Sequence, residues 1–397
     1  MNRPESQSIP WHQNAVWLQV SLAAWIVALV VISVMVALNP DDRTVTGLYH
    51  EASRNWLTRQ PLYVGPSGMN YFPHFAILFT PFHWLPIPIG DIAWRWVGGL
   101  TLISGIWRIT NNQFARGTNT ILPWILLLTL PLSLSALRYG QANALFSGLL
   151  VHATASIVRQ RWSSSTLWMV LAVIVKPLGF VMLLLAPFVY APLRLRVLGG
   201  ILFLLVIPFL FADFHYVWSQ YLSSYINLKS CSVVVEHRFA DFQGIVRTFG
   251  GELPTQVALS VRMIAAVVTL CVWILASRQF GEPLRAFWLL ALTTIYLMLF
   301  NPMNESNSYV ILAPAISLWA LTLLATPQCQ TLGWWLVAMV LSIGILKEPL
   351  RPLFGNNFAL VWNPMMAISF FVVLTLLLRA TRKLSLTPMS TKVLNQQ

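Results

Sequence analysis

Acidic residues are scarce in this chain. Its 397 residues include 12 Asp and Glu against 25 Lys and Arg, and charged residues of both signs make up only 9% of the total. Hydrophobic residues make up 57%, more than a soluble globular domain uses. Repeated apolar runs of about 15–24 residues are typical of transmembrane helices. The composition therefore predicts an all-α polytopic membrane protein, with residues 1–397 forming a single integral membrane domain.

Motifs for metals and nucleotides are also missing. The three cysteines, Cys231, Cys271 and Cys329, give no disulfide framework and no metal-ligand spacing. The chain has no CxxC, HExxH, GxGxxG or P-loop sequence, so we expect neither a metal nor a cofactor. The net charge of +13 could indicate nucleic acid, but the basic residues stand singly or in pairs at the ends of apolar runs. Membrane topology explains that distribution better, and no nucleic-acid partner is expected.

Basic flanks set the expected topology. One arginine pair precedes residues 162–193 and another follows them, so this stretch is expected to cross the membrane an even number of times. As one helix it would be about 48 Å long, so two short spans that turn at Lys176–Gly179 fit better. Residues 116–159 are expected to fold the same way, with Arg138–Asn143 at the turn. Both turns then lie on the non-cytoplasmic side of the plasma membrane.

Twelve spans follow from this scheme, with both termini in the cytoplasm. They are expected at 15–38 and 92–107, twice within 116–159, twice within 162–193, and at 197–213, 257–277, 284–300, 307–325, 332–346 and 358–378. The first run is too long for a signal-peptide core and lacks a small-residue cleavage site, so it is expected to be retained. Residues 71–86 are short and carry three prolines, which favours an interfacial or re-entrant segment.

Two loops are expected on the outer face. These are a first loop at 39–90, with interfacial helices, and a large loop at 214–256. The topology places ten of the 12 carboxylates outside and leaves only Glu5 and Glu282 inside. Because orientation depends mainly on Lys and Arg, this acidic bias is not needed for topology. The outer face is therefore the expected place for acid–base chemistry.

Two adjacent acids, Asp41 and Asp42, open the first outer loop. Next comes Thr46–Leu57, where Leu48, Ala52 and Trp56 recur every four residues, as in a helix lying in the membrane interface. A plain amphipathic connector with a hydrated end would look the same. Mutual repulsion of two acids can instead raise one pKa and leave a base near neutrality.

Polar residues at the two predicted turns have two interpretations. Arg138, Gln141, Asn143 and Lys176 all fall at span ends on one side. They can be snorkelling cations and helix caps. Alternatively, a cation at the headgroup level can hold a phosphate.

Several motifs in order resemble a known family. They are the acidic pair, "LYHEASRNWLTRQPLY", "YFPHFAILFTPFHWLP", "RYGQAN", "VIVKPLG" and "DFQGIVRTFG". Over about residues 15–310 the chain resembles glycosyltransferase family 87, the polyprenyl-phosphate-mannose-dependent mannosyltransferases of the C-type superfamily. The resemblance implies transfer of a hexose from a polyprenyl-phosphate sugar to a lipid or glycan acceptor, with inversion and an Asp general base.

The resemblance also implies roles for particular residues. Asp42 is the preferred base and Asp41 the alternative, and His50 or Glu51 could share that role. The implied phosphate-binding residues are Lys176, Arg138 and Arg247. The implied sugar or acceptor contacts are Tyr49, His50, Glu51, Tyr71, His74, Gln141, Asn143 and Glu305.

Two other classes of protein compete with this interpretation. A transporter or flippase for a lipid-linked or anionic substrate should show internal repeats and polar groups near the midplane. The sequence shows no clear repeat, and its polar groups gather near span ends and in the outer loops. A structural subunit would leave the acidic bias unexplained. An enzyme with a sugar donor, an acceptor and membrane lipids as partners fits best.

Overall fold

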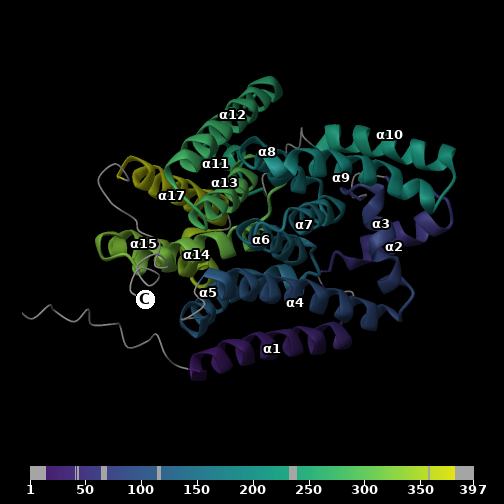
Figure 1. Ribbon diagram of the computed structural model, residues 1–397. Helices are drawn as coiled ribbons and strands as arrows, with labels where there is room; N and C mark the ends of the chain where they lie inside the picture. The colour runs from purple at the N-terminus through teal and green to yellow at the C-terminus, as the bar shows by residue number, and fades with distance from the viewer. Residues whose placement is uncertain are drawn as a thin grey trace, which may run out of the picture.

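Helices make up nearly all of the described structure. A computed structural model describes residues 15–40, 42, 44–63, 69–113, 118–231, 239–355 and 358–380, and no strand occurs in these ranges. The α-helices are α1 (Ala15–Leu38), α2 (Thr46–Leu57), α3 (Pro73–His83), α4 (Ile87–Gln113), α5 (Thr118–Arg138), α6 (Asn143–Val158), α7 (Trp162–Val175), α8 (Phe180–Val189), α9 (Arg194–Val206), α10 (Phe214–Cys231), α11 (Phe242–Thr248), α12 (Thr255–Gln279), α13 (Leu284–Phe300), α14 (Ala313–Leu324), α15 (Gln330–Gly344), α16 (Lys347–Phe354) and α17 (Phe358–Ala380) (Figure 1). Short 3₁₀ helices join some of them: η2 (Pro177–Gly179), η3 (Ala191–Leu193), η4 (Ile207–Leu210), η5 (Ser306–Ile311) and η6 (Pro327–Cys329).

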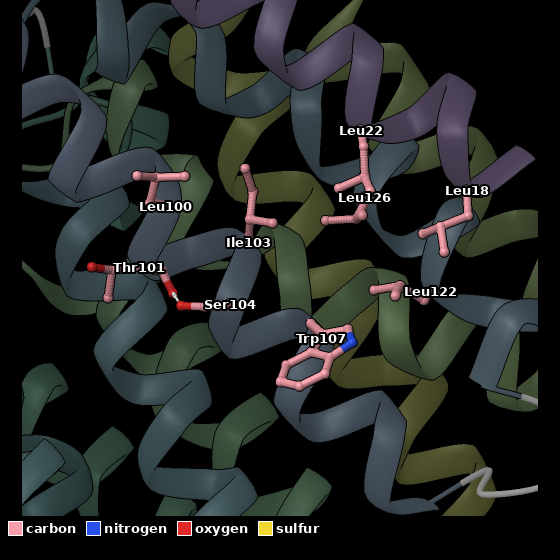
Figure 2. Close-up of a pocket in the computed structure, with 9 residues that line it drawn as sticks. All are labelled: Leu18, Leu22, Leu100, Thr101, Ile103, Ser104, Trp107, Leu122 and Leu126. Carbon is pink, nitrogen blue, oxygen red and sulfur yellow. Dashed lines mark hydrogen bonds between the residues drawn. The ribbon is translucent and has the colours of Figure 1, made fainter.

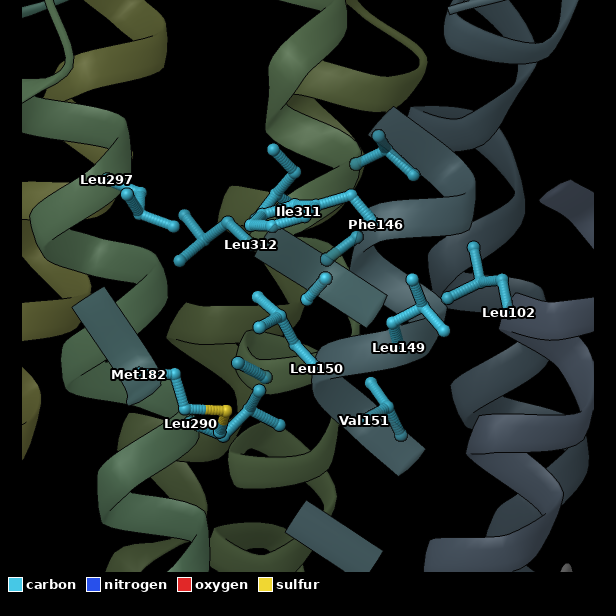
Figure 3. Packing of buried hydrophobic residues seen from close by; sticks show 14 of the residues in the cluster. Leu102, Phe146, Leu149, Leu150, Val151, Met182, Leu290, Leu297, Ile311 and Leu312 are labelled. Atoms are coloured by element: carbon cyan, nitrogen blue, oxygen red, sulfur yellow. The ribbon is translucent and has the colours of Figure 1, made fainter. Parts of the chain in front are cut away.

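Helix α6 is the centre of the bundle. Its sequence is apolar almost all round, which is typical of a helix without a solvent face, and the side chains from residue 143 to 157 are all buried. It packs against α4, α7, α13 and η5. Figure 3 shows Phe146, Leu149 and Leu150 of α6 among apolar side chains of α4, α8 and α13. The residues at the two ends of α6 are therefore anchored to a buried helix.

Small residues let α4 and α6 approach closely. A Cβ at Gly148 would lie 2.7 Å from the backbone nitrogen of Leu102, and one at Gly105 would lie 3.0 Å from the carbonyl oxygen of Gly148. Glycine at such crossings allows two backbones to pack closely, as in many membrane helix pairs. The α4–α6 pair consequently fixes how the start of α4 sits beside the start of α6.

Five described helical segments are long and apolar enough to cross a membrane. They are Ala15–Leu38, Ile121–Arg138, Ala191–Leu210, Thr255–Gln279 and Phe358–Ala380. Shorter apolar helices stand at Asn143–Val158, Trp162–Val175, Pro177–Val189, Leu284–Phe300 and Ala313–Leu324. An all-α membrane protein is thus confirmed. Each predicted span contains a helix and the first coincides with α1, while the total of twelve crossings and their direction stay predictions.

Helix α2 has the predicted bounds but a different buried face. Its buried side includes Tyr49, Ala52 and Trp56, whereas Leu48 is 39% exposed. The spacing of three and four residues between buried positions is that of a helix packed along one stripe. The partner is α3. Helix α2 therefore packs on protein along the stripe that contains Tyr49, and the exposed Leu48 leaves the interfacial placement of α2 a prediction.

Helix α3 occupies most of the segment predicted to be interfacial or re-entrant. With 11 residues it is about 16 Å long, too short to cross a hydrocarbon core of about 30 Å. It lies against α2, α4, α7 and α10. A helix of this length packed among other helices fits an interfacial or re-entrant segment, and that placement stays a prediction.

The predicted large loop at 214–256 contains two helices. Helix α10 fills residues 214–231 and α11 fills 242–248, and residues 232–238 lie outside the described part of the chain. Phe214, Trp218 and Leu222 on α10 are each more than half exposed. Polar residues such as His215, Ser219 and Gln220 interrupt this apolar stripe and hid the helical period in the sequence. The side of the membrane on which this segment lies stays a prediction.

Candidate functional site

The turn between α5 and α6 is a helix-ending motif built on glycine. Gly140 has φ of 66°, the left-handed conformation that favours glycine. Its N–H donates to the carbonyl of Leu137, and the N–H of Gln141 donates to that of Ala136. This pair of bonds is the Schellman arrangement, which satisfies the last carbonyls of a helix. The turn places Gln141 and Asn143 at the start of α6.

An amide and carboxylate chain leads away from this turn. Gln141 Nε2 donates to Glu305 Oε2 at 2.8 Å, and Asn143 Nδ2 donates to Gln141 Oε1 at 2.6 Å. Asn143 is 1% exposed, and its Oδ1 lacks a hydrogen-bond partner. Buried polar atoms are normally paired, so an unpaired acceptor is a feature to explain. Three predicted contact residues are brought together here by segments more than 160 positions apart.

Lys176 lies beside this chain, at the turn between α7 and η2. Pro177 restricts the residue before it to extended backbone, and Lys176 has φ of −150° and ψ of 136°. Its Nζ lies 5.7 Å from the ring centroid of Tyr71. Burial lowers the pKa of Lys176 to about 8, while the negative charge of Glu305 acts in the opposite direction. Desolvation by burial disfavours the charged form of a lysine.

Two tyrosine hydroxyls complete this group. Tyr49 Oη and Tyr71 Oη are 2.9 Å apart and share a hydrogen bond. Burial raises the pKa of Tyr71 to about 12, so both hydroxyls keep their protons at neutral pH. We name Tyr49, Tyr71, Gln141, Asn143, Lys176 and Glu305 the lysine cluster. Hydroxyls and an ammonium in one place provide donors for an anionic ligand.

Asp42 pairs with Arg138 close to the same turn. The nearest atoms, Asp42 Oδ2 and Arg138 Nη2, are 3.5 Å apart, and both side chains are partly exposed. The loop of Asp42 is tied to the turn, because the Val45 N–H donates to the carbonyl of Tyr139 at 3.0 Å. Asp41, the alternative base, lies outside the described residues. Asp42 is therefore an accessible carboxylate just before α2. Its partner Arg138 stands three residues before Gln141 in the chain.

A buried ion pair that the sequence analysis missed holds this arrangement together. Asp91 and Arg95, one turn apart on α4, are 1% and 3% exposed. Asp91 accepts from Thr46 Oγ1 at 2.6 Å and lies 3.0 Å from His50 Nε2. Arg95 donates to the carbonyl of Arg138. The sequence did contain a signal for this pair, because Asp91 and Arg95 are opposite charges spaced at i and i+4 in a chain with few acidic residues.

His50 and Glu51 take different positions on α2. His50 is buried, with Nε2 facing Asp91 and Nδ1 3.2 Å from Nδ1 of His83. Glu51 is exposed on the opposite side. The structure therefore places His50 in the buried pair's network rather than beside Asp42.

Two further predicted site residues, His74 and Arg247, make contacts outside the lysine cluster. His74 is buried, and its Nε2 lies 2.6 Å from the carbonyl oxygen of Leu204, a contact between α3 and α9. Arg247 lies on α11, where its charge acts on Asp241 and Arg262. Helix α11 is nevertheless anchored near Glu305, because the Ala240 N–H donates to the Asn304 carbonyl. The packing role of His74 had no signal in the sequence.

Asp241 is a second buried carboxylate that the candidate set left out. It is fully buried and caps α11 by accepting from the Gly244 N–H at 2.7 Å. Burial raises its pKa to about 6, and an oxygen at a helix N-cap position is a common stabilising feature. Within the described ranges, His, Cys, Asp and Glu side chains form no group of three that could hold a metal ion.

The fold and the site define an integral membrane protein with a cluster of polar side chains near the α5–α6 and α7–η2 turns. Residues 70–302 match the family described as glycosyltransferase family 87, which is more than half of the chain. The chain therefore belongs to glycosyltransferase family 87 and is a membrane glycosyltransferase. No curated protein matches it.

Proposed function

We propose that this glycosyltransferase moves a hexose, mannose being the first candidate, from a polyprenyl-phosphate sugar to a lipid or glycan acceptor at the outer face of the plasma membrane. One observation carries the proposal: Gln141 of the lysine cluster lies on the same turn as Arg138, the partner of the accessible Asp42. A cation for a phosphate and a base for a hydroxyl are the two groups that such a transfer needs.

The donor phosphate would bind in the lysine cluster. The ammonium of Lys176 attracts the anion, and the protonated hydroxyls of Tyr49 and Tyr71 donate hydrogen bonds to its oxygens. Charge-assisted hydrogen bonds of this kind are about twice as strong as neutral ones. Gln141, Asn143 and Glu305 present amides and a carboxylate, which suit the hydroxyls of a sugar. The free Asn143 Oδ1 is available to a sugar hydroxyl.

The transfer step uses Asp42, or Asp41 in its place, as general base. The carboxylate takes the proton of the acceptor hydroxyl while that oxygen forms a bond to the anomeric carbon. The bond from that carbon to the phosphate oxygen breaks, and its electron pair leaves with the polyprenyl phosphate. Attack opposite to the leaving group inverts the anomeric configuration. A positioned base contributes about 10²–10⁴-fold to such a step.

Arg138 and Arg247 have secondary roles in this proposal. Arg138 faces Asp42 at 3.5 Å, which orients that carboxylate, and its remaining guanidinium N–H groups would be free to turn toward the leaving phosphate. Arg247 lies on α11 and adds positive charge near the 301–305 segment, to which α11 is hydrogen-bonded. Neither residue replaces Lys176, which alone of the three lies against Tyr71.

Reconstituted enzyme tests the proposal. Wild type is offered a panel of polyprenyl-phosphate hexoses with lipid and glycan acceptors, and sugar transfer is measured beside Asp42→Asn, Asp41→Asn and Glu252→Gln. Glu252 is an exposed carboxylate outside the site, so its variant controls for charge loss alone. One aspartate variant should lose about 10²–10⁴-fold in kcat. Full activity of both would exclude these bases. Translocation of a labelled lipid without sugar transfer would favour a flippase.

A further inference from the structure

An apolar groove lies between α1, α4 and α5, far from the lysine cluster. Its volume is about 460 Å³, within the range of about 300–1,000 Å³ found for small-molecule sites. Leucines of all three helices line it together with Ile103, Ser104 and Trp107 of α4 (Figure 2). Its lining comes from the first turns of α1 and α5 and from the second half of α4.

A polar path leads from the groove to an arginine. Ser104 Oγ, on the groove wall, lies 3.0 Å from His152 Nε2. The other ring nitrogen of His152 is 3.4 Å from Arg108 Nη1, and Arg108 Nη2 is 3.5 Å from Ser164 Oγ. A ligand in the groove would therefore have a guanidinium at one end.

Positive charge gathers at this end without an acidic partner. Arg159 Nη2 donates to the backbone carbonyl of Arg108 at 3.2 Å, and the charges of Arg159 and Arg161 both act against that of Arg108. Within the described part of the chain, none of the three forms an ion pair with a carboxylate. Arg159 Nε is buried and has no hydrogen-bond partner. Like charges held together in this way favour an anion between them, and guanidinium suits phosphate.

Aromatic residues mark the depth of this end. Trp107 lies on the groove wall, and the rings of Trp17 and Trp124 pack with centroids 5.0 Å apart. Tryptophan is enriched where membrane hydrocarbon meets the headgroups. Tryptophans on and beside the groove are what a site with its polar end at the headgroup level would have.

We propose that this groove binds one anionic glycerophospholipid. Its phosphate would lie between Arg108 and Arg159, and one acyl chain would fill the groove against Leu22 and Trp107. The site is separate from the donor site, because α6 leads from Asn143 to the basic end over 16 residues, a distance of about 24 Å. It is independent of which sugar the enzyme transfers.

Native mass spectrometry of the full-length protein measures the binding. Protein is taken from bilayers of phosphatidylcholine that contain phosphatidylglycerol, and retained lipids are counted. Wild type should retain one phosphatidylglycerol in preference to phosphatidylcholine. Arg108→Gln and Arg159→Gln should each weaken its retention about tenfold or more, as expected for hydrogen bonds to a charged group. Arg278→Gln, an exposed arginine at the end of α12, removes the same charge elsewhere and should retain the lipid.

A groove-filling variant tests the acyl chain separately. Leu22 is 37% exposed, so the larger ring of Leu22→Trp can enter the groove without displacing core residues. This variant should lose the lipid while all arginines remain. If Arg108→Gln does not fold, Arg159→Gln and Leu22→Trp carry the test. Equal retention in the groove and control variants, equal retention of phosphatidylcholine, or displacement of the lipid by inorganic phosphate alone would overturn the proposal.

Discussion

Asp91 and Arg95 form a buried ion pair, with Asp91 Oδ2 and Arg95 Nη1 3.7 Å apart on neighbouring turns of α4. Through Thr46 and the Arg138 carbonyl, this pair fastens α2 and the α5–α6 turn to the start of α4. The two segments that carry Asp42 and Gln141 are therefore held by a pair that is itself buried. Asp91 and Arg95 are positioning residues for the proposed site.

Asp91→Asn should destabilise the protein by about 3–5 kcal/mol, because it leaves the Arg95 guanidinium buried without its counter-charge. Thermal unfolding in detergent measures this loss. The double variant Asp91→Asn/Arg95→Gln removes both charges and should recover part of it. If the single variant unfolds at the wild-type temperature, the pair does not fasten these segments.

Gly140→Ala should lower stability and transfer activity more than Gly250→Ala does, although both glycines have positive φ, 66° and 81°. A left-handed residue with a side chain costs about 1–2 kcal/mol, and both variants share that cost. Only at Gly140 would the new Cβ lie 2.6 Å from Thr46 Cγ2 and 2.9 Å from Arg95 Nη2, since nothing lies within 4 Å at Gly250. Unfolding temperature and transfer rate should both fall further for Gly140→Ala. Equal losses would contradict a close fit between the turn and α2.

The elements that sequence predicted well are those governed by local periodicity. Apolar runs predicted α1 with its observed bounds, and the four-residue repeat predicted α2. Basic flanks and span length predicted turns at Lys176–Gly179 and Arg138–Asn143, where the structure has breaks between helices. Helix α10 was missed, because polar residues between its aromatic positions resemble a loop in composition.

For contacts between distant segments, the sequence predicted candidate residues but not which of them pair with one another. The motifs named Gln141 and Glu305 separately, but their hydrogen bond joins segments 164 positions apart, and no local pattern specifies such a pairing. The same holds for the contact between His50 and Asp91, which joins two helices 41 positions apart. Burial decides these roles, and burial on a helix packed on all sides is not visible in its own sequence.

The alkaline limb of activity should follow the ammonium of Lys176, whose pKa burial lowers to about 8. As pH rises through that value the ammonium loses its proton, and kcat/KM for the donor should fall about tenfold per pH unit. Unfolding does not explain such a loss. Between the folded pKa and the ordinary lysine pKa of 10.5, the unfolded state binds more protons at this group, so its contribution to stability rises with pH.

Lys176→Arg is the matched variant for this pH dependence. Arginine keeps its charge far above pH 8, so the alkaline limb should move to higher pH even if the rate near neutrality is lower. A pH profile of kcat/KM with the preferred donor measures the change. An unchanged limb in Lys176→Arg would assign the titration to another group.

Glu305→Gln should move the alkaline limb in the opposite direction. The negative charge of Glu305 raises the pKa of Lys176 against the effect of burial, so its removal lowers that pKa and the limb appears at lower pH. Glutamine can still accept the hydrogen bond from Gln141, now 2.8 Å long, so the turn should keep its structure. Glu252→Gln, which removes an exposed carboxylate outside the cluster, should leave the limb in place. A limb that stays in place or moves upward in Glu305→Gln would show that this carboxylate does not act on the group that titrates in the alkaline limb.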